Sequence, residues 1–202
     1  MINPVHADFD EVVPGEIRTF AMSAFDPSPL SVAAVNALDA AAFTERLGDI
    51  AEHSPWVAER AAAARPFASR EAVVAAFVAA VRAAPPESQL ALIRAHPDLA
   101  DRAAVADDAG GGDIAAESRR EQAGAGLDRL TPDEFERFAD LNARYRARFG
   151  FPFIFAVKGA NKDMILAAFE ERIDNDAATE RATALANVER ILRHRIEDRI
   201  AP

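Results

Sequence analysis

The chain has 202 residues, no cysteine, and a formal net charge of −10 from 33 acidic and 23 basic side chains. Without cysteine there can be no disulfide framework, no zinc–thiolate site and no cysteine nucleophile. The acidic balance argues against nonspecific nucleic-acid binding, because that needs basic surface to release counterions. The length suits a single domain with at most short additions.

Half of the residues are hydrophobic, but many of these are alanine, which favours helix and buries little area. The apolar run from Val73 to Val81 is shorter than the roughly 20 residues that a membrane span needs. The first residues, with His6 and Asp8, lack the basic start and apolar core of a signal peptide. We therefore expect a soluble, cytoplasmic, mostly helical protein.

Residues 1–30 hold four prolines and no sustained helical period, which predicts an irregular N-terminal arm. Helix signals begin after it. Asp39 is placed to cap a helix that ends at Gly48, and Ser54-Pro55 to open a second one. Ser69 starts a third, whose apolar residues recur at spacings of three and four.

The second half of the chain continues in the same way. Pro85-Pro86 starts a short helix, and a flexible Gly110–Gly112 linker precedes a polar helix over 113–126. Thr131 and Glu134 form a capping box, and the last helix is predicted over 177–199.

One segment, Phe149–Val157, is aromatic, β-prone and interrupted by glycine and proline. A buried extended segment leaves backbone N–H and C=O groups without helical partners, and such groups are useful beside a polar ligand. The predicted fold class is therefore all-α. We expect a single helical-bundle domain of about eight helices over 31–202, with one buried extended Phe-Gly-Phe-Pro-Phe segment.

His96 is the most interesting of the four histidines. Pro97 disfavours helical geometry at His96, so its ring is expected to project from a helix end, where the helix dipole would keep its pKa near the working range. A histidine that only caps the helix is the alternative.

Two further clusters carry polar groups. Ser118, Glu121 and Gln122 share one face of the polar helix, which suits either a small ligand rich in N–H and C=O groups or a solvated surface. Arg195 lies on the buried stripe of the last helix, so it needs a carboxylate partner from the protein or from a substrate. The chain has no phosphate-binding loop and no His-Glu-x-x-His motif, and we expect no dedicated metal site.

Together these segments resemble the family of OHCU decarboxylases, which act on 2-oxo-4-hydroxy-4-carboxy-5-ureidoimidazoline (OHCU) in urate breakdown. The resemblance covers about residues 35–200. Its most specific motifs are His-Pro-Asp-Leu from His96, Ser-x-x-Glu-Gln from Ser118, and Phe-Gly-Phe-Pro-Phe from Phe149.

The resemblance implies an all-helical homodimer and a decarboxylase without a cofactor, producing (S)-allantoin. It implies that His96 is the catalytic histidine and a proton donor, and that Arg195 matches an arginine in the family's closing pattern, where Arg193 is the other candidate. The residues implied to line the substrate pocket are Pro97, Ser118, Arg119, Arg120, Glu121, Gln122, Phe153, Ile154, Phe155, Ala156 and Val157.

The substrate can supply its own electron sink, because the carboxylate leaves from a carbon next to a C=N bond. As a hypothesis, His96 manages the proton, Glu121 holds either the histidine or the substrate hydroxyl, and Arg195 binds an anionic or carbonyl oxygen. Urate oxidase and hydroxyisourate hydrolase are the expected functional neighbours. The alternatives are a helical lyase or hydrolase for another ureide, and a noncatalytic interaction module.

Overall fold

The computed structural model describes residues 29–100 and 113–202; the predicted arm up to residue 28 and the Gly110–Gly112 linker lie outside them. In this part of the chain the fold is all-α, as predicted. The helices are α1 (Val32–Ala37), α2 (Ala40–Leu47), α3 (Trp56–Ala62), α4 (Arg70–Arg82), α5 (Pro86–Arg94), α7 (Asp113–Gly124), α8 (Pro132–Phe149), α9 (Lys162–Arg172) and α10 (Ala177–Arg199), with single 3₁₀ turns η1 (Gly48–Ile50) and η2 (Leu127–Arg129).

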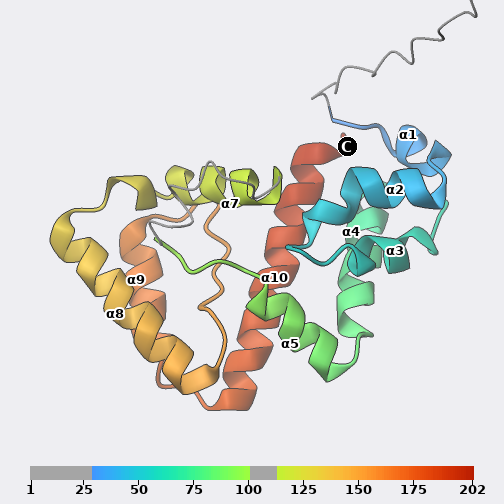
Figure 1. The fold of residues 1–202 in the computed structure, drawn as a ribbon. Helices are drawn as coiled ribbons and strands as arrows, with labels where there is room; N and C mark the ends of the chain where they lie inside the picture. Colours follow the sequence, from blue (N-terminus) through green and yellow to red (C-terminus); the bar gives the residue numbers. More distant parts are fainter. Residues whose placement is uncertain (1–28, 101–112) are drawn as a thin grey trace, which may run out of the picture.

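Helix α10 is the centre of the molecule. Figure 1 shows it running between two groups, α1 to α5 on one side and α7 to α9 on the other. The start of the described chain lies beside its C-terminal end, because the Leu30 N–H donates to the Arg199 carbonyl at 2.8 Å. Among the described residues, no helix is both long and apolar enough to cross a membrane.

The predicted caps place the helices well. The Ser69 hydroxyl accepts from the Ala72 N–H at 3.2 Å, and Thr131 and Glu134 form the predicted capping box of α8. The predicted polar helix ends at Gly124, two residues early, because Gly126 adopts a left-handed conformation with φ of 80°. Two helices, α1 and α9, are absent from the prediction, although the side chains of Ser31 and Asn161 cap them.

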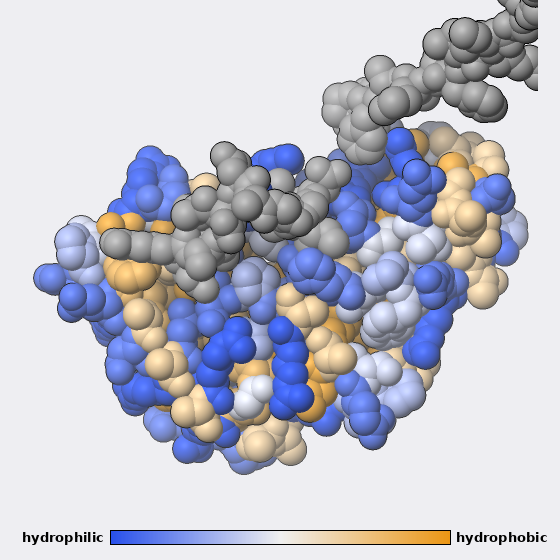
Figure 2. All heavy atoms as spheres, viewed as in Figure 1, coloured by the Kyte–Doolittle hydropathy of each residue, from blue (hydrophilic) through white to orange (hydrophobic). Residues whose placement is uncertain are grey.

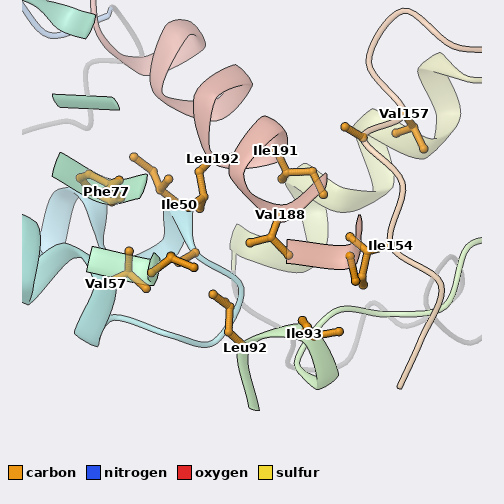
Figure 3. Packing of buried hydrophobic residues seen from close by; sticks show 14 of the residues in the cluster. Ile50, Val57, Phe77, Leu92, Ile93, Ile154, Val157, Val188, Ile191 and Leu192 are labelled. Atoms are coloured by element: carbon orange, nitrogen blue, oxygen red, sulfur yellow. The ribbon is translucent and has the colours of Figure 1, made fainter. Parts of the chain in front are cut away.

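The core joins both groups of helices through α10. Figure 3 shows Val188, Ile191 and Leu192 of α10 among side chains from the two sides, which include Phe77 of α4 and Ile154 of the extended segment. Figure 2 shows hydrophilic and hydrophobic residues mixed over the visible face of the molecule.

The extended segment predicted around Phe153 is buried and runs beside α10. Two side chains hold its backbone. Arg172 of α9 donates from Nη1 to the Ile154 carbonyl at 2.9 Å, and the Ala156 N–H donates to Oδ1 of Asn187 at 3.1 Å. These contacts satisfy backbone groups that a helix would have paired internally.

A buried polar group, here called the anchoring cluster, fixes Arg172. It consists of Tyr145, Arg172, Asn175 and Glu180. The Glu180 carboxylate is fully buried and accepts from Arg172 Nε at 3.0 Å, from Asn175 Nδ2 at 2.7 Å and from the Tyr145 hydroxyl. Burial and this bond raise the pKa of Tyr145, so the phenol stays protonated and donates.

Candidate active site

A pocket opens where the end of α5, helix α7, the extended segment and α10 meet. Its volume is about 340 Å³, including its open mouth. The residues that line it are His96, Pro97, Leu99, Ser118, Glu121, Gln122, Phe153, Ile154, Phe155, Val157, Ile191 and Arg195. The three clusters that the sequence singled out are therefore brought together here.

His96 follows the last turn of α5 and is 7% exposed. Its Nδ1 lies 2.9 Å from the Leu92 carbonyl, and since a carbonyl can only accept, Nδ1 carries the proton and Nε2 has a free lone pair. Burial lowers the pKa of His96 to about 4, helped by the charge of Arg195. The expected helix-end effect on this pKa was wrong, because desolvation outweighs it.

Ser118, Glu121 and Gln122 line the pocket from one face of α7, the face that their spacing predicted. The Gln122 Oε1 accepts from the Ala100 N–H at 3.0 Å, so within the described part of the chain its amide NH₂ remains to bind a ligand. Glu121 does not hold His96 in this structure, since its two oxygens accept from Arg195 Nε and Nη2 at 3.1 Å each.

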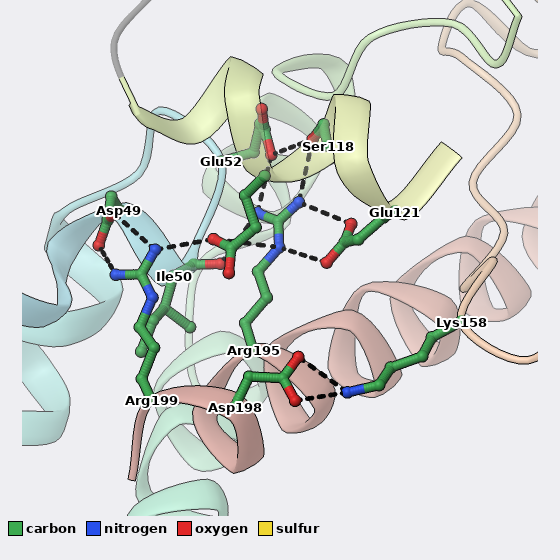
Figure 4. A network of polar contacts seen from close by, with 10 residues as sticks. Asp49, Ile50, Glu52, Ser118, Glu121, Lys158, Arg195, Asp198 and Arg199 are labelled. Atoms are coloured by element: carbon green, nitrogen blue, oxygen red, sulfur yellow. Dashed lines mark hydrogen bonds and ion pairs between the residues drawn. The ribbon is translucent and has the colours of Figure 1, made fainter. Parts of the chain in front are cut away.

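Arg195 is only 1% exposed, and contacts with the protein occupy all of its nitrogens. Nε and Nη2 donate to Glu121, Nη2 also to the Ser118 hydroxyl at 3.0 Å, and Nη1 to Glu52 at 2.9 Å and the Ile50 carbonyl at 3.3 Å (Figure 4). Its partner is therefore internal, the first of the two possibilities that its position on the buried stripe left open. Arg193 is exposed, 3.8 Å from Glu197, and does not line the pocket.

The surroundings of Arg195 are acidic. Glu117 lies 3.8 Å from Nε of Arg195 and accepts from Arg199 at 2.7 Å, and Arg199 also pairs with Asp49 at 2.6 Å. The two guanidinium groups thus face four carboxylates, those of Asp49, Glu52, Glu117 and Glu121 (Figure 4). Since these carboxylates balance its charge and its nitrogens already have partners, Arg195 offers no unpaired positive charge to a bound anion.

Glu52 is the residue that sequence reasoning missed. It is 2% exposed, and its Oε2 accepts from both the Ser118 hydroxyl, at 3.1 Å, and Arg195. Burial raises its pKa, which Arg195 partly opposes. The available signal was indirect: a buried arginine requires a carboxylate, but nothing in the local sequence identified which one.

Three residues that the resemblance assigned to the pocket lie outside its lining. Arg119 is half-buried and Arg120 is exposed, and neither contributes to the pocket wall. Ala156 is buried, and Asn187 already accepts from its N–H. Among the described residues, no group of three or more histidine, aspartate or glutamate side chains is arranged to hold a metal ion.

Comparisons with known proteins identify the family of this chain. A family model described as OHCU decarboxylase matches residues 36–197. The 2-oxo-4-hydroxy-4-carboxy-5-ureidoimidazoline decarboxylase of Haloferax volcanii is 45% identical over 172 residues, which are 85% of this chain and 97% of that protein. The uric acid degradation bifunctional protein PucL of Bacillus subtilis is 43% identical over 164 residues, and the match spans 81% of this chain and 31% of PucL.

Solved structures show the same relationship. A crystal structure of (S)-allantoin synthase aligns with a TM-score of 0.67 and 31% identity over 85% of this chain, which spans 54% of that chain. A crystal structure of OHCU decarboxylase in the presence of (S)-allantoin aligns with a TM-score of 0.55 at 22% identity and supports the fold. This chain belongs to the OHCU decarboxylase family.

Proposed function

We propose that this protein decarboxylates OHCU to (S)-allantoin in urate degradation, without a cofactor. Family membership supports the choice of substrate. The observation that carries the chemistry is a buried, neutral His96 whose Nε2 lone pair is free in a pocket that also holds a carboxylate, a hydroxyl and an amide. That combination suits proton transfer on a small, polar ring system rich in N–H and C=O groups.

The substrate provides its own electron sink. When the bond between the ring carbon and the carboxylate breaks, CO₂ leaves and the electron pair forms a C=C bond to the neighbouring carbon. The π pair of the C=N bond moves onto the ring nitrogen, which takes up a proton from the solvent. The product of this step is an enol. Conversion to allantoin then requires removal of the hydroxyl proton and delivery of a proton to the neighbouring carbon.

His96 fits both parts of that conversion. Its neutral Nε2 accepts the proton of the substrate hydroxyl, and the imidazolium then returns a proton to the carbon on one face, which sets the configuration. The resemblance implied a proton donor; the neutral ground state adds that His96 acts first as a base. The Leu92 carbonyl holds the ring through Nδ1 in both steps.

The other pocket groups bind different parts of the substrate. Gln122 donates through its NH₂, and Glu121 accepts from the substrate hydroxyl or N–H groups. In the extended segment, Ile154, Ala156 and Val157 each use one backbone group within the protein, so the backbone of Phe153 and Phe155 is the better source of contacts. Because its nitrogens are all engaged, Arg195 orients Glu121 and Ser118 rather than binding a substrate oxygen.

The test generates OHCU with urate oxidase and hydroxyisourate hydrolase, adds this protein, and follows circular dichroism. We expect rapid, one-handed formation of (S)-allantoin. Racemic allantoin at the uncatalysed rate would reject the proposal, and turnover of another ureide alone would indicate a different lyase or hydrolase. Replacement His96→Asn should lower kcat by about 10²- to 10⁴-fold, the usual contribution of a positioned acid–base group.

The proposal extends to the setting of the reaction. A homodimer in the cytoplasm, with urate oxidase and hydroxyisourate hydrolase as the enzymes that supply the substrate, remains our prediction. The PucL relative, named as a bifunctional protein of uric acid degradation, supports the link to that route. Size-exclusion chromatography with light scattering tests the dimer.

A further inference from the structure

We propose that Glu52 is a positioning residue for this decarboxylation. It accepts the hydrogen bond that the Ser118 hydroxyl donates, so that Ser118 can act toward the substrate only as a hydrogen-bond acceptor. It also holds Arg195 in place. The proposal rests on the proposed function. It adds a residue that does not line the pocket and assigns it a specific effect on one that does.

The hydrogen bonds around Ser118 define this effect. A serine hydroxyl has one proton and two lone pairs. The proton goes to Glu52 Oε2 at 3.1 Å, and one lone pair accepts from Arg195 Nη2 at 3.0 Å. Only a lone pair remains, so a substrate N–H can bind to Ser118 and a substrate carbonyl cannot.

Glu52 acts on Arg195 through a single turn of the chain. Oε2 of Glu52 and the carbonyl of Ile50, two residues earlier, both accept from Nη1 of Arg195, at 2.9 and 3.3 Å. With Nη1 held there, Nε and Nη2 are directed to Glu121 in a two-point contact. Figure 4 shows Arg195 between Glu52 and Ser118 on one side and Glu121 on the other.

Because these groups are buried, each depends on its protein partners for its hydrogen bonds. Glu52 is 2% exposed, Arg195 1% and Ser118 7%, so water cannot easily replace a lost partner. In such surroundings an unpaired hydroxyl or guanidinium group reorients toward whatever acceptor is near. Removal of Glu52 would leave the Ser118 proton free to turn into the pocket, where it would repel a substrate N–H.

Two substitutions separate the acceptor from the charge. Glu52→Gln retains a carbonyl oxygen that can occupy the position of Oε2 and accept both bonds, whereas Glu52→Met fills the same space without an acceptor. We expect kcat/KM to fall by about 10²-fold in the methionine variant and by less than about tenfold in the glutamine variant, as for loss of hydrogen bonds to charged groups. Equal losses in both variants, or none in Glu52→Met, would overturn the proposal.

A double-mutant cycle separates positioning from general damage to the fold. In a Ser118→Ala background there is no hydroxyl to orient and only the contact with Arg195 is lost, so Glu52→Met should cost about tenfold rather than 10²-fold. The matched control is Ser69→Ala, a helix-capping serine outside the pocket, in whose background the full loss of about 10²-fold should persist. The same loss in both backgrounds would show that Glu52 does not act through Ser118 and would overturn that part of the proposal.

A spectroscopic measurement is independent of turnover. The Nε–Hε group of Arg195 should give a highly ordered NMR signal in the wild type and in Glu52→Gln, and a clearly more mobile one in Glu52→Met. Unchanged order in Glu52→Met would contradict the positioning role. If the wild type failed to act on OHCU, the proposed function would fall, while this signal would still show whether Glu52 holds Arg195.

Discussion

Two buried groups of arginine and glutamate side chains include residues of helix α10, and the two groups have different roles. The anchoring cluster is centred on Glu180, near the start of α10. The second group, the pocket cluster, consists of Glu52, Ser118, Glu121 and Arg195. Glu180 and Arg195 are fifteen residues apart, or about 22 Å along the helix axis. Each pairs a guanidinium group with carboxylates away from water.

The two clusters differ in charge balance and in what they leave available. The anchoring cluster has one carboxylate and one guanidinium group, and its other members, Tyr145 and Asn175, are neutral donors directed inward. In the pocket cluster, two carboxylates share Arg195, and Glu121 and Ser118 also line the pocket. A balanced, closed cluster stabilises a fold, whereas one with spare acceptors at a cavity wall can act on a ligand.

Breaking the anchoring cluster should have the largest effect on the stability of the fold. Arg172→Met leaves Glu180, which is fully buried, without its cation and frees the Ile154 carbonyl. We expect the free energy of unfolding to fall by about 3–5 kcal/mol, as when one partner of a buried ion pair is removed. Urea denaturation measures this.

The matched control for this change is Arg193→Met. Arg193 is exposed on the same helix as Glu180 and lies 3.8 Å from Glu197, so its loss should change stability by less than about 1 kcal/mol. Similar losses for the two variants would mean that the anchoring cluster does not stabilise the fold.

Breaking the pocket cluster should affect activity more than stability. Arg195→Met removes the group that orients Glu121 and Ser118, so kcat/KM should fall by about 10²- to 10³-fold, comparable to loss of a preorganised donor. Glu52, whose pKa burial already raises, can take up a proton when its partner is lost, which limits the cost in stability. Stability loss as large as in Arg172→Met, with activity retained, would contradict this difference.

Apart from α9, which carries Arg172, the sequence predicted the helices that hold these clusters better than it predicted the clusters themselves. Capping residues such as Asp39, Ser69 and Thr131 identify helix starts because their side-chain bonds are local. The spacing of Arg195 from Val188 and Ile191 placed it on the buried stripe for the same reason. Local periodicity is enough to place a side chain on a face.

The partners across the fold could not be predicted in this way. Glu52 and Arg195 are 143 residues apart, and Ser118 and Arg195 are 77 apart, so only the tertiary structure brings them together. The prediction of the His96 pKa was wrong for a related reason. The helix end is visible in the sequence, but the packing that desolvates the ring is not. Contacts that depend on several elements need the fold first.

A third prediction concerns His96 and the dependence of stability on pH. Its pKa in the folded state, about 4, lies below the ordinary value of 6.5, so between these values the unfolded chain binds more protons. Stability should therefore decrease as pH falls from about 6.5 to 4, by up to about 3 kcal/mol from this residue. In His96→Asn this part of the slope should disappear in denaturation curves measured from pH 7 to 4.

Activity should follow the same group in the wild type. Because the neutral form of His96 acts as the base, kcat/KM should stay nearly constant from about pH 8 to 5.5 and fall only as the pH approaches 4. A decline centred near pH 6.5 would show that the ring is charged more easily than its burial implies.

The smallest expected effect lies between the two clusters, at Asn187. Its Oδ1 accepts from the Ala156 N–H at 3.1 Å and its Nδ2 donates to the Thr183 carbonyl at 3.0 Å, so it ties the extended segment to the middle of α10. Asn187→Ala should lower the free energy of unfolding by about 1 kcal/mol, because one buried backbone donor loses its partner. Since Ala156 does not line the pocket, kcat/KM should fall by less than about threefold. A larger fall in activity than in stability would place Asn187 with the pocket cluster, and would mean that the segment needs fixing on both sides to present its backbone to the substrate.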